Sequence, residues 1–146
     1  MQIEDKGELR GEFSLTITRK NGEIIEQFTE KNLILNGAKN QLARLIGSEA
    51  TNRHITHIGF GGGVNAASPG DTSLNNAFFK PVTTASYPAT GQVAFKWSLS
   101  TAEANGIAIT EFGLRCADGT LFARKVRAPI TKSDDISITG TWIIIF

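Results

Sequence analysis

The amino-acid sequence predicts an all-β fold, a mainly antiparallel and jelly-roll-like β-sandwich with one short α-helix at residues 37–46. Roughly seven to nine short segments alternate apolar and polar residues, which is the pattern of half-buried strands. Two dipeptides, Asn21-Gly22 and Asp118-Gly119, favour tight turns between antiparallel strands. Helical spacing occurs only once, so we expect a single substantial helix.

Composition sets outer bounds on the function. The chain has 146 residues, with 15 Lys and Arg against 14 Asp and Glu, and a formal net charge of +1. This balance favours neither nucleic acid nor an acidic membrane as a partner. The length suits a single β-sandwich domain at residues 12–146, preceded by a charged and flexible arm at residues 1–11.

Cys116 is the only cysteine, which excludes an intrachain disulfide and any multi-cysteine metal site. Its place on the apolar side of a predicted strand indicates a buried thiol. The N-terminal residues contain no apolar signal-peptide core, and no run approaches the roughly 18 apolar residues of a membrane span. We therefore expect synthesis in the cytoplasm without secretion or membrane insertion.

The first strands form a predicted hairpin. Phe13, Leu15 and Ile17 alternate with polar residues, and residues 24–28 return after the Asn21-Gly22 turn. Because both of these turn residues tolerate positive φ angles, we expect a type I′ turn.

The helix is predicted at residues 37–46, where Ala38 and Leu42 share one face with the apolar residues that follow. Asn36 precedes this segment and is expected to cap it through its side chain. Gly47 follows as the expected C′ residue, the position at which glycine commonly ends a helix.

A strand and a long loop follow the helix. Residues 54–60 place Thr56, Ile58 and Phe60 on one side and continue into three glycines. Residues 61–81 are rich in Gly, Asn, Ala, Ser and Pro, a composition typical of loops. Loops of this length within a compact domain are usually functional or cover another surface.

The second half of the chain predicts the core strands. A short strand at residues 82–87 precedes a strongly alternating strand at residues 93–99, in which Trp97 is expected to lie in the core. The last strand, residues 136–146, is apolar on both faces near its end. Such a strand is normally central in a sheet or covered on both sides.

The firmest local prediction is the hairpin at residues 107–126, with a type I′ turn at Asp118-Gly119. Phe112 and Leu114 alternate with Glu111 and other residues of the opposite face. One face of this hairpin should therefore pack on the core, while the other meets water or a partner.

No recognisable catalytic or metal-binding motif is present. The glycines at residues 61–63 lack both the Gly-Lys-Ser/Thr ending and the spacing of phosphate-binding loops. His54 and His57 are the only histidines, and three residues apart in a strand they point to opposite faces. A nucleophilic triad has no supporting motif. We therefore expect neither enzyme activity nor a cofactor or metal.

Charged residues leave two weaker alternatives. Candidate carboxylates for glycoside hydrolysis are Glu103, Glu111, Asp118, Asp134 and Asp135, although a turn explains Asp118 and a solvated loop explains the last two.

Basic residues that could contact nucleic-acid phosphates are Arg115, Arg124, Lys125, Arg127 and Lys132. The near-zero net charge and the lack of interleaved aromatic residues disfavour nucleic acid, and Glu111 could pair across the hairpin with Arg124 or a neighbouring basic residue.

Several motifs, taken in order, resemble a known family. They are Lys31-Asn-Leu-Ile-Leu-Asn-Gly, Ile55-Thr-His-Ile-Gly-Phe-Gly, Ala67-Ser-Pro-Gly-Asp-Thr-Ser-Leu-Asn-Asn, Ile109-Thr-Glu-Phe-Gly-Leu and Asp118-Gly-Thr-Leu-Phe-Ala-Arg, with a Lys before the final strand. This order resembles structural proteins of tailed bacteriophages, in particular the attachment domain of tail-collar fibre proteins. The similarity covers residues 32–146.

The resemblance implies a non-enzymatic virion component, a tail, collar or baseplate fibre-attachment protein whose partners are other virion proteins. Collar fibres continue into a shaft and a receptor-binding tip that this sequence lacks, so we expect a small standalone component. We also expect a homo-oligomer, with a trimer favoured by the family, in which the arm and the long loop contact neighbours. The residues expected at subunit contacts are Gly61, Gly62, Gly63, Pro69, Asp71, Leu74, Arg115, Arg124 and Arg127.

Two alternatives remain open. A capsid decoration protein or a head–tail neck protein belongs to the same structural class. A carbohydrate-binding module belongs to a different class, because β-sandwiches often present loops and aromatic side chains to sugars. Tyr87 and Trp97 are the candidate stacking residues, although Trp97 also fits the core.

Overall fold

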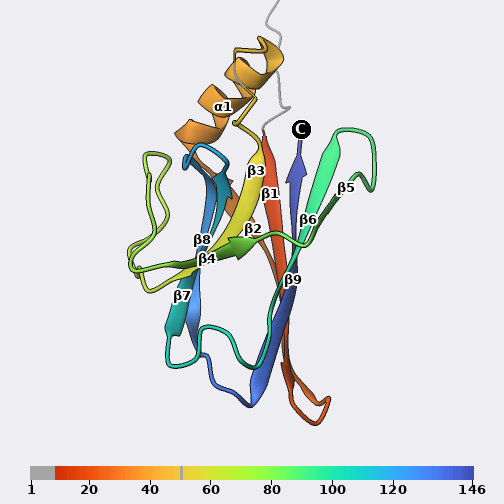
Figure 1. The fold of residues 1–146 in the computed structure, drawn as a ribbon, viewed down its shortest axis with the longest axis vertical. Coiled ribbons are helices and arrows are strands. Elements are labelled where there is room, and N and C mark those ends of the chain that lie inside the picture. The colour runs from red at the N-terminus through yellow and green to blue at the C-terminus, as the bar shows by residue number, and fades with distance from the viewer. Residues whose placement is uncertain (1–8, 50) are drawn as a thin grey trace, which may run out of the picture.

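The computed structural model describes residues 9–49 and 51–146 and consists mainly of antiparallel strands (Figure 1). This confirms the predicted all-β class with one short helix. The elements are β1 (Arg10–Arg19), β2 (Ile24–Ile34), α1 (Asn36–Ile46), β3 (Ile55–Gly61), β4 (Phe78–Pro81), β5 (Thr84–Ser86), β6 (Gln92–Leu99), β7 (Ala108–Cys116), β8 (Leu121–Thr131) and β9 (Ile136–Ile145).

The strands form one curled sheet in the order β4-β3-β7-β8-β2-β1-β9-β6-β5. Figure 1 shows β4, β3, β7 and β8 on one side and β1, β9, β6 and β5 on the other. We call the first group the β3 layer, and the second group together with β2 the β9 layer. The apolar core lies between these layers.

Two bent segments connect the layers. β2 pairs along β1, but only Leu33 and Ile34 at its end pair with β8. At the opposite corner, Val82 donates its N–H to the Thr56 carbonyl of β3, and Thr83 donates to the Lys96 carbonyl of β6. Strands that pass from one layer to the other are the usual way in which a folded sheet turns a corner.

Aromatic side chains from both layers fill the core. Phe13 and Trp142 of the β9 layer lie 4.9 Å apart between ring centroids, and Phe112 of the β3 layer lies 4.8 Å from Phe13. Trp97 is only 2% exposed and packs 5.4 Å from Phe60. The alternation in the sequence therefore identified the core strands correctly, since each buries its apolar face.

The apolar last strand is central, as predicted. β9 pairs with β1 along one side and with β6 along the other. Ile143 and Ile145, on its outer face, are half-buried. Pairing on both sides removes the free edge that would otherwise promote aggregation.

Both predicted hairpins are present, but their turns are not type I′. Within each of these turns only the glycine has a positive φ angle, 92° at Gly22 and 95° at Gly119, whereas a type I′ turn requires two such residues. The side chain of Asn21 accepts the Glu23 N–H at 2.9 Å, and that of Asp118 accepts the Thr120 N–H at 3.1 Å. These local bonds favour a turn in which glycine alone takes the left-handed position.

The ends of the helix also differ from prediction. α1 begins at Asn36, and Leu35 occupies the N-cap position without a side-chain capping bond. Asn36 instead donates its N–H to the Pro69 carbonyl of the long loop at 2.9 Å, so tertiary structure replaces the predicted cap. Gly47 has a right-handed φ of −78°, and the left-handed residue is Ser48, at 56°.

Two segment boundaries shift as well. Of the arm predicted at residues 1–11, residues 1–8 lie outside the described part, while Arg10 and Gly11 belong to β1. The loop predicted at residues 61–81 ends in β4, because its last residues pair with the edge of β3. The strand predicted at residues 82–87 is reduced to β5.

Candidate functional site

A buried cluster of charged residues joins the long loop to the β3 layer. Glu111 of β7 is 1% exposed and Arg124 of β8 is 5% exposed. The Arg124 Nε donates to Glu111 Oε1 at 2.9 Å, and its Nη1 donates to Asp71 Oδ2 of the loop at 2.9 Å. We call Glu111, Arg124 and Asp71 the loop cluster. Of the partners considered for Glu111 across the hairpin, Arg124 or a neighbour, the structure shows Arg124.

The second carboxylate oxygen of Glu111 accepts hydrogen bonds from two backbone N–H groups of the long loop. Glu111 Oε2 accepts the Gly63 N–H at 2.5 Å and the Asn75 N–H at 2.8 Å. A Cβ atom at Gly63 would lie 2.5 Å from this oxygen, and one at Gly61 would lie 2.7 Å from it. The glycines therefore leave space for a buried carboxylate, in place of the phosphate that glycine-rich loops can bind.

Asp71 is fixed by its own loop and by the sheet. The hydrogen bond from the Ser68 N–H, at 2.8 Å, lowers the pKa of the Asp71 carboxyl, and Arg124 lowers this pKa further. The ionised form of Asp71 is thus the form that the folded loop stabilises.

Leu74 completes the cover over the β3 layer. A Cβ atom at Gly59 would lie 2.8 Å from Leu74 Cδ1, and one at Gly113 would lie 2.9 Å from the same atom. Leu74 thus fills the space above two glycines on neighbouring strands. The face of β7 that we expected to meet water or a partner is covered instead by the loop of its own chain, and for this reason both faces of β7 are buried.

The other basic residues near the hairpin also have partners within the chain. The Arg115 guanidinium lies 3.9 Å from the Phe79 ring centroid, and Arg127 makes a two-point ion pair with Glu26. Lys125 pairs with Glu30. Lys132 is 1% exposed and donates to Asn105 Oδ1 at 2.8 Å and to the Ser133 carbonyl at 3.0 Å, and burial lowers its pKa.

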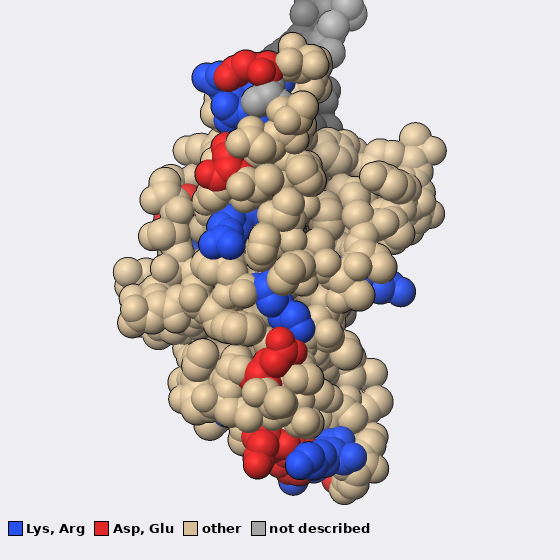
Figure 2. Space-filling model, in the orientation of Figure 1, with Lys and Arg blue, Asp and Glu red and all other residues tan. Residues whose placement is uncertain are grey.

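The charged side chains of the surface are largely grouped. Figure 2 shows most acidic and basic side chains of this face along a band that runs down the molecule, with one separate basic side chain at its right edge. The pairs of Arg127 and Lys125 join β8 to β2 below the short stretch where the two backbones are hydrogen-bonded. A free basic patch of the kind that binds nucleic acid is not formed by these residues.

Glu103, Asp118 and Cys116 are also occupied or buried within the chain. The Lys80 ammonium, 2.8 Å from Glu103, lowers the pKa of that carboxyl. Asp118 accepts a hydrogen bond from Gln41 at 2.8 Å and ties the hairpin turn to α1. Burial raises the pKa of the Cys116 thiol to about 11, so the thiol stays protonated and unreactive near neutral pH.

Within residues 9–49 and 51–146, no group of three or more His, Cys, Asp or Glu side chains is arranged to hold a metal ion. No helix in this described part is long and apolar enough to cross a membrane. Trp97 is in the core, whereas Tyr87 is 79% exposed. These two aromatic residues therefore do not form the stacking platform considered from the sequence.

The residues expected at subunit contacts divide into two groups. Gly61, Gly63, Asp71, Leu74 and Arg124 pack within the chain at the loop cluster. Arg115 and Arg127 also have partners within the chain, as described above. Gly62 is half-buried and Pro69 is exposed, as is the neighbouring loop residue Val64, which was not among the expected residues. The part of the long loop that can reach a neighbour is therefore its outer rim, and its participation in subunit contacts stays a prediction.

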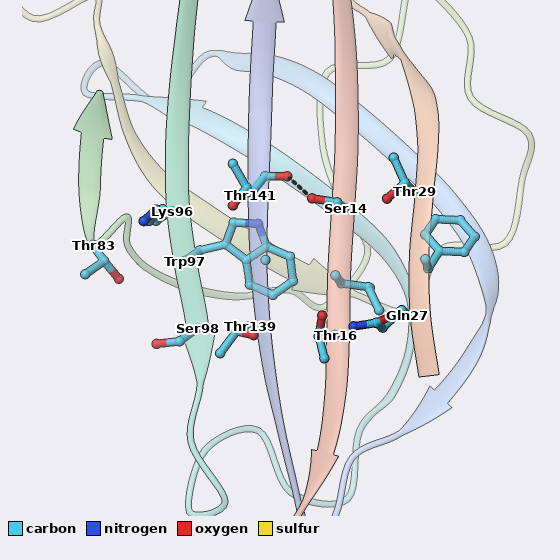
Figure 3. Close-up of a pocket in the computed structure, with 13 residues that line it drawn as sticks. Ser14, Thr16, Gln27, Thr29, Thr83, Lys96, Trp97, Ser98, Thr139 and Thr141 are labelled. Carbon is cyan, nitrogen blue, oxygen red and sulfur yellow. Dashed lines mark hydrogen bonds between the residues drawn. The ribbon is translucent and has the colours of Figure 1, made fainter. Parts of the chain in front are cut away.

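Sequence reasoning did not identify an open polar hollow on the outer face of the β9 layer. It has a volume of about 650 Å³ and is shown in Figure 3. We call it the outer hollow; its polar lining consists of Ser14, Thr16, Gln27, Thr29, Thr83, Lys96, Ser98, Thr139 and Thr141. The signal in the sequence was the run of Ser and Thr at the outward positions of three strands.

A second open feature is an apolar cleft between α1 and the end of β9, with a volume of about 140 Å³. We call it the α1 cleft; its apolar lining consists of Leu42, Leu45, Ile55, Val93, Phe95, Phe122, Ile144 and Phe146. Phe146 is 57% exposed and the neighbouring Ile46 is 87% exposed. Exposed apolar groups beside a cleft are typical of contact surfaces.

Comparison with known proteins identifies no relative of this chain. No protein-family model matches it, and no curated protein or solved structure is significantly similar to it. The functional argument therefore starts from the loop cluster, the outer hollow and the α1 cleft.

Proposed function

We propose that this protein is a non-enzymatic structural component of a tailed-bacteriophage virion, a tail, collar or baseplate fibre-attachment protein that acts through subunit contacts. One observation supports this most directly. The motifs that carry the family resemblance supply Gly59, Gly61, Asp71, Glu111 and Arg124, and these residues pack together around the long loop. These motifs thus supply contacts within the domain, which suits a structural role and leaves none of these charged groups free for a reaction.

The α1 cleft is the surface proposed for contacts between copies. Its lining is mostly apolar and includes the exposed Phe146, and the exposed Ile46 follows the lining residue Leu45 in α1. Burying such side chains contributes roughly 1.5–3 kcal/mol each, which provides a driving force for association. A symmetric homo-oligomer, with a trimer as the favoured form, would bury this end of each subunit.

Light scattering on the purified full chain tests the assembly. We expect the mass of a trimer that persists on dilution, and dissociation of the Ile46→Ser/Phe146→Ser variant. The matched control is Ile24→Ser/Ile25→Ser, because these two residues are also exposed but lie in the hairpin of β1 and β2. A monomer at every concentration, or equal effects of the two variants, would contradict the proposed contact surface.

The virion assignment needs a separate experiment. Antibodies raised against the purified chain should label tailed particles, and the labelled position separates a tail or collar component from the alternative of a capsid decoration or neck protein. Particles that carry no label and contain no peptides of this chain by mass spectrometry would refute the assignment.

A further inference from the structure

The outer hollow is formed by two rows of side chains on adjacent strands. Strand register places Ser14 opposite Thr29 and Thr141, and it places Thr141 opposite Lys96. Figure 3 shows these side chains on the same side of the sheet. Because directly opposed residues share a face, they form a continuous row across β2, β1, β9 and β6.

The second row has the same arrangement. Thr16 lies opposite both Gln27 and Thr139, and Thr139 lies opposite Ser98. Thr83, at the corner beyond β6, borders the hollow on that side. The volume of about 650 Å³ is within the range of roughly 300–1,000 Å³ that is typical of ligand sites.

The hydrogen-bonding groups of these rows are largely free. Among the described residues, Ser14 alone in this lining uses its side chain in a hydrogen bond, to the Thr141 carbonyl at 3.2 Å. The other hydroxyls and the Gln27 amide have no side-chain hydrogen bond to any residue of the described part of the chain. Each hydroxyl can donate one hydrogen bond and accept others, so the surface can match a ligand that carries many hydroxyl groups.

The charge of the outer hollow limits which class of ligand it can bind. Lys96 is the only charged residue in the lining, and no carboxylate of the described residues pairs with it. Nucleic acid would require several cations that follow a phosphate backbone. A lone ammonium among neutral hydroxyls instead matches a sugar that carries a carboxylate, because a charged hydrogen bond is stronger than a neutral one.

We propose that the outer hollow binds an acidic saccharide, with the hydroxyl rows contacting sugar hydroxyls and Lys96 contacting a sugar carboxylate. This site lies on the outer face of the sheet, whereas the α1 cleft lies between the helix and the chain end. The proposal is independent of the subunit contacts described above.

Nuclear magnetic resonance titration of the full chain tests the proposal with three hexasaccharides, composed of galacturonic acid, sialic acid or neutral glucose. At concentrations up to about 10 mM, above the millimolar Kd of a weak site, at least one acidic hexamer should shift amide signals of β1, β6 and β9. The neutral hexamer should bind about tenfold more weakly, as expected for loss of one charged hydrogen bond.

Two variants sharpen the test. Thr16→Val/Thr139→Val removes two hydroxyls with little change in shape and should weaken binding about tenfold or more. Thr18→Val is the matched control, because Thr18 lies on the same strand outside the hollow.

Lys96→Gln should remove the preference for the acidic hexamer, whereas Lys39→Gln on α1 should preserve it. Absence of shifts with both acidic hexamers, shifts mapping elsewhere, or unchanged binding by the threonine variant would overturn the proposal.

Discussion

The outer faces of the two layers differ in whether the chain covers them. Glu111, Arg124 and two glycines lie on the outside of the β3 layer, and the loop after β3 covers them. The outside of the β9 layer carries mostly neutral hydroxyl side chains, with Lys96 as the charged residue of the outer hollow, and it remains open. Buried charge is stable only with a complete set of partners, whereas exposed hydroxyls need no cover. The face with buried charge thus requires a lid, and the face with exposed hydroxyls and one exposed lysine is free for contact.

The largest expected difference between the faces comes from Glu111→Gln. It leaves Arg124 buried beside a neutral partner, which should lower the free energy of unfolding by about 3–5 kcal/mol. Urea denaturation measures the change. Glu30→Gln is the control, because the Glu30 side chain is 54% exposed and its pair with Lys125 should contribute at most about 1 kcal/mol. Equal effects would show that the loop cluster has no special structural role.

A second comparison adds one methyl group to each layer. The Cβ atom of a Gly140→Ala variant would lie 2.1 Å from the Trp97 ring and 2.7 Å from the Ser14 carbonyl oxygen. We expect a loss of about 1–3 kcal/mol in unfolding free energy. In Gly113→Ala the nearest atoms, at 2.9 Å, end the flexible side chains of Leu121 and Leu74, so the loss should be smaller. The reverse order in urea denaturation would contradict the packing described for the two layers.

The two faces should also respond differently to acid. The Asp71 pKa is lowered in the folded chain, so its ionised form stabilises the loop above the usual carboxyl pKa of about 4. This contribution is lost as pH falls through the lowered pKa. The stability difference between wild type and Asp71→Asn should therefore be present at neutral pH and disappear in acid, as measured by urea denaturation across pH. A difference independent of pH would contradict it.

The smallest expected effect is that of Thr16→Val on the open face. Thr16 makes no side-chain hydrogen bond among the described residues, and valine suits strands at least as well as threonine. The unfolding free energy should change by less than about 0.5 kcal/mol in either direction. A large loss in thermal or urea denaturation would reveal a structural role for the hydroxyl rows.

The strands were predictable because alternation depends on neighbours along the chain. Trp97 and the other large apolar residues occupy the core that this pattern assigned to them. The turn type was not predictable from Asn21-Gly22 or Asp118-Gly119, because side-chain bonds to nearby N–H groups favour a different local conformation. The helix cap failed for a different reason: the helix begins at Asn36 itself, whose N–H donates to a carbonyl of a distant loop, and Leu35 takes the N-cap position.

The candidate sites were predictable only in part. Alternation placed Glu111 opposite the core face, and hairpin pairing suggested Arg124 as its partner, but nothing local indicated that Asp71 would join them. The outer hollow depends on the register of the β1–β2 hairpin with β9 and β6, which are far from that hairpin in the sequence. Its hydroxyl residues were visible as outward positions, whereas their assembly into rows required the order of the strands.

Hydrogen exchange at the Gly63 and Asn75 amides tests most directly whether the chain covers its own β3 layer. Both amides donate to Glu111 Oε2 in the free chain. We predict strong protection of both in the purified protein at neutral pH, and loss of that protection in Glu111→Gln. Exchange of both amides in the wild-type chain at the rates of an unstructured peptide would contradict this account, because the loop would then depend on a partner for its order.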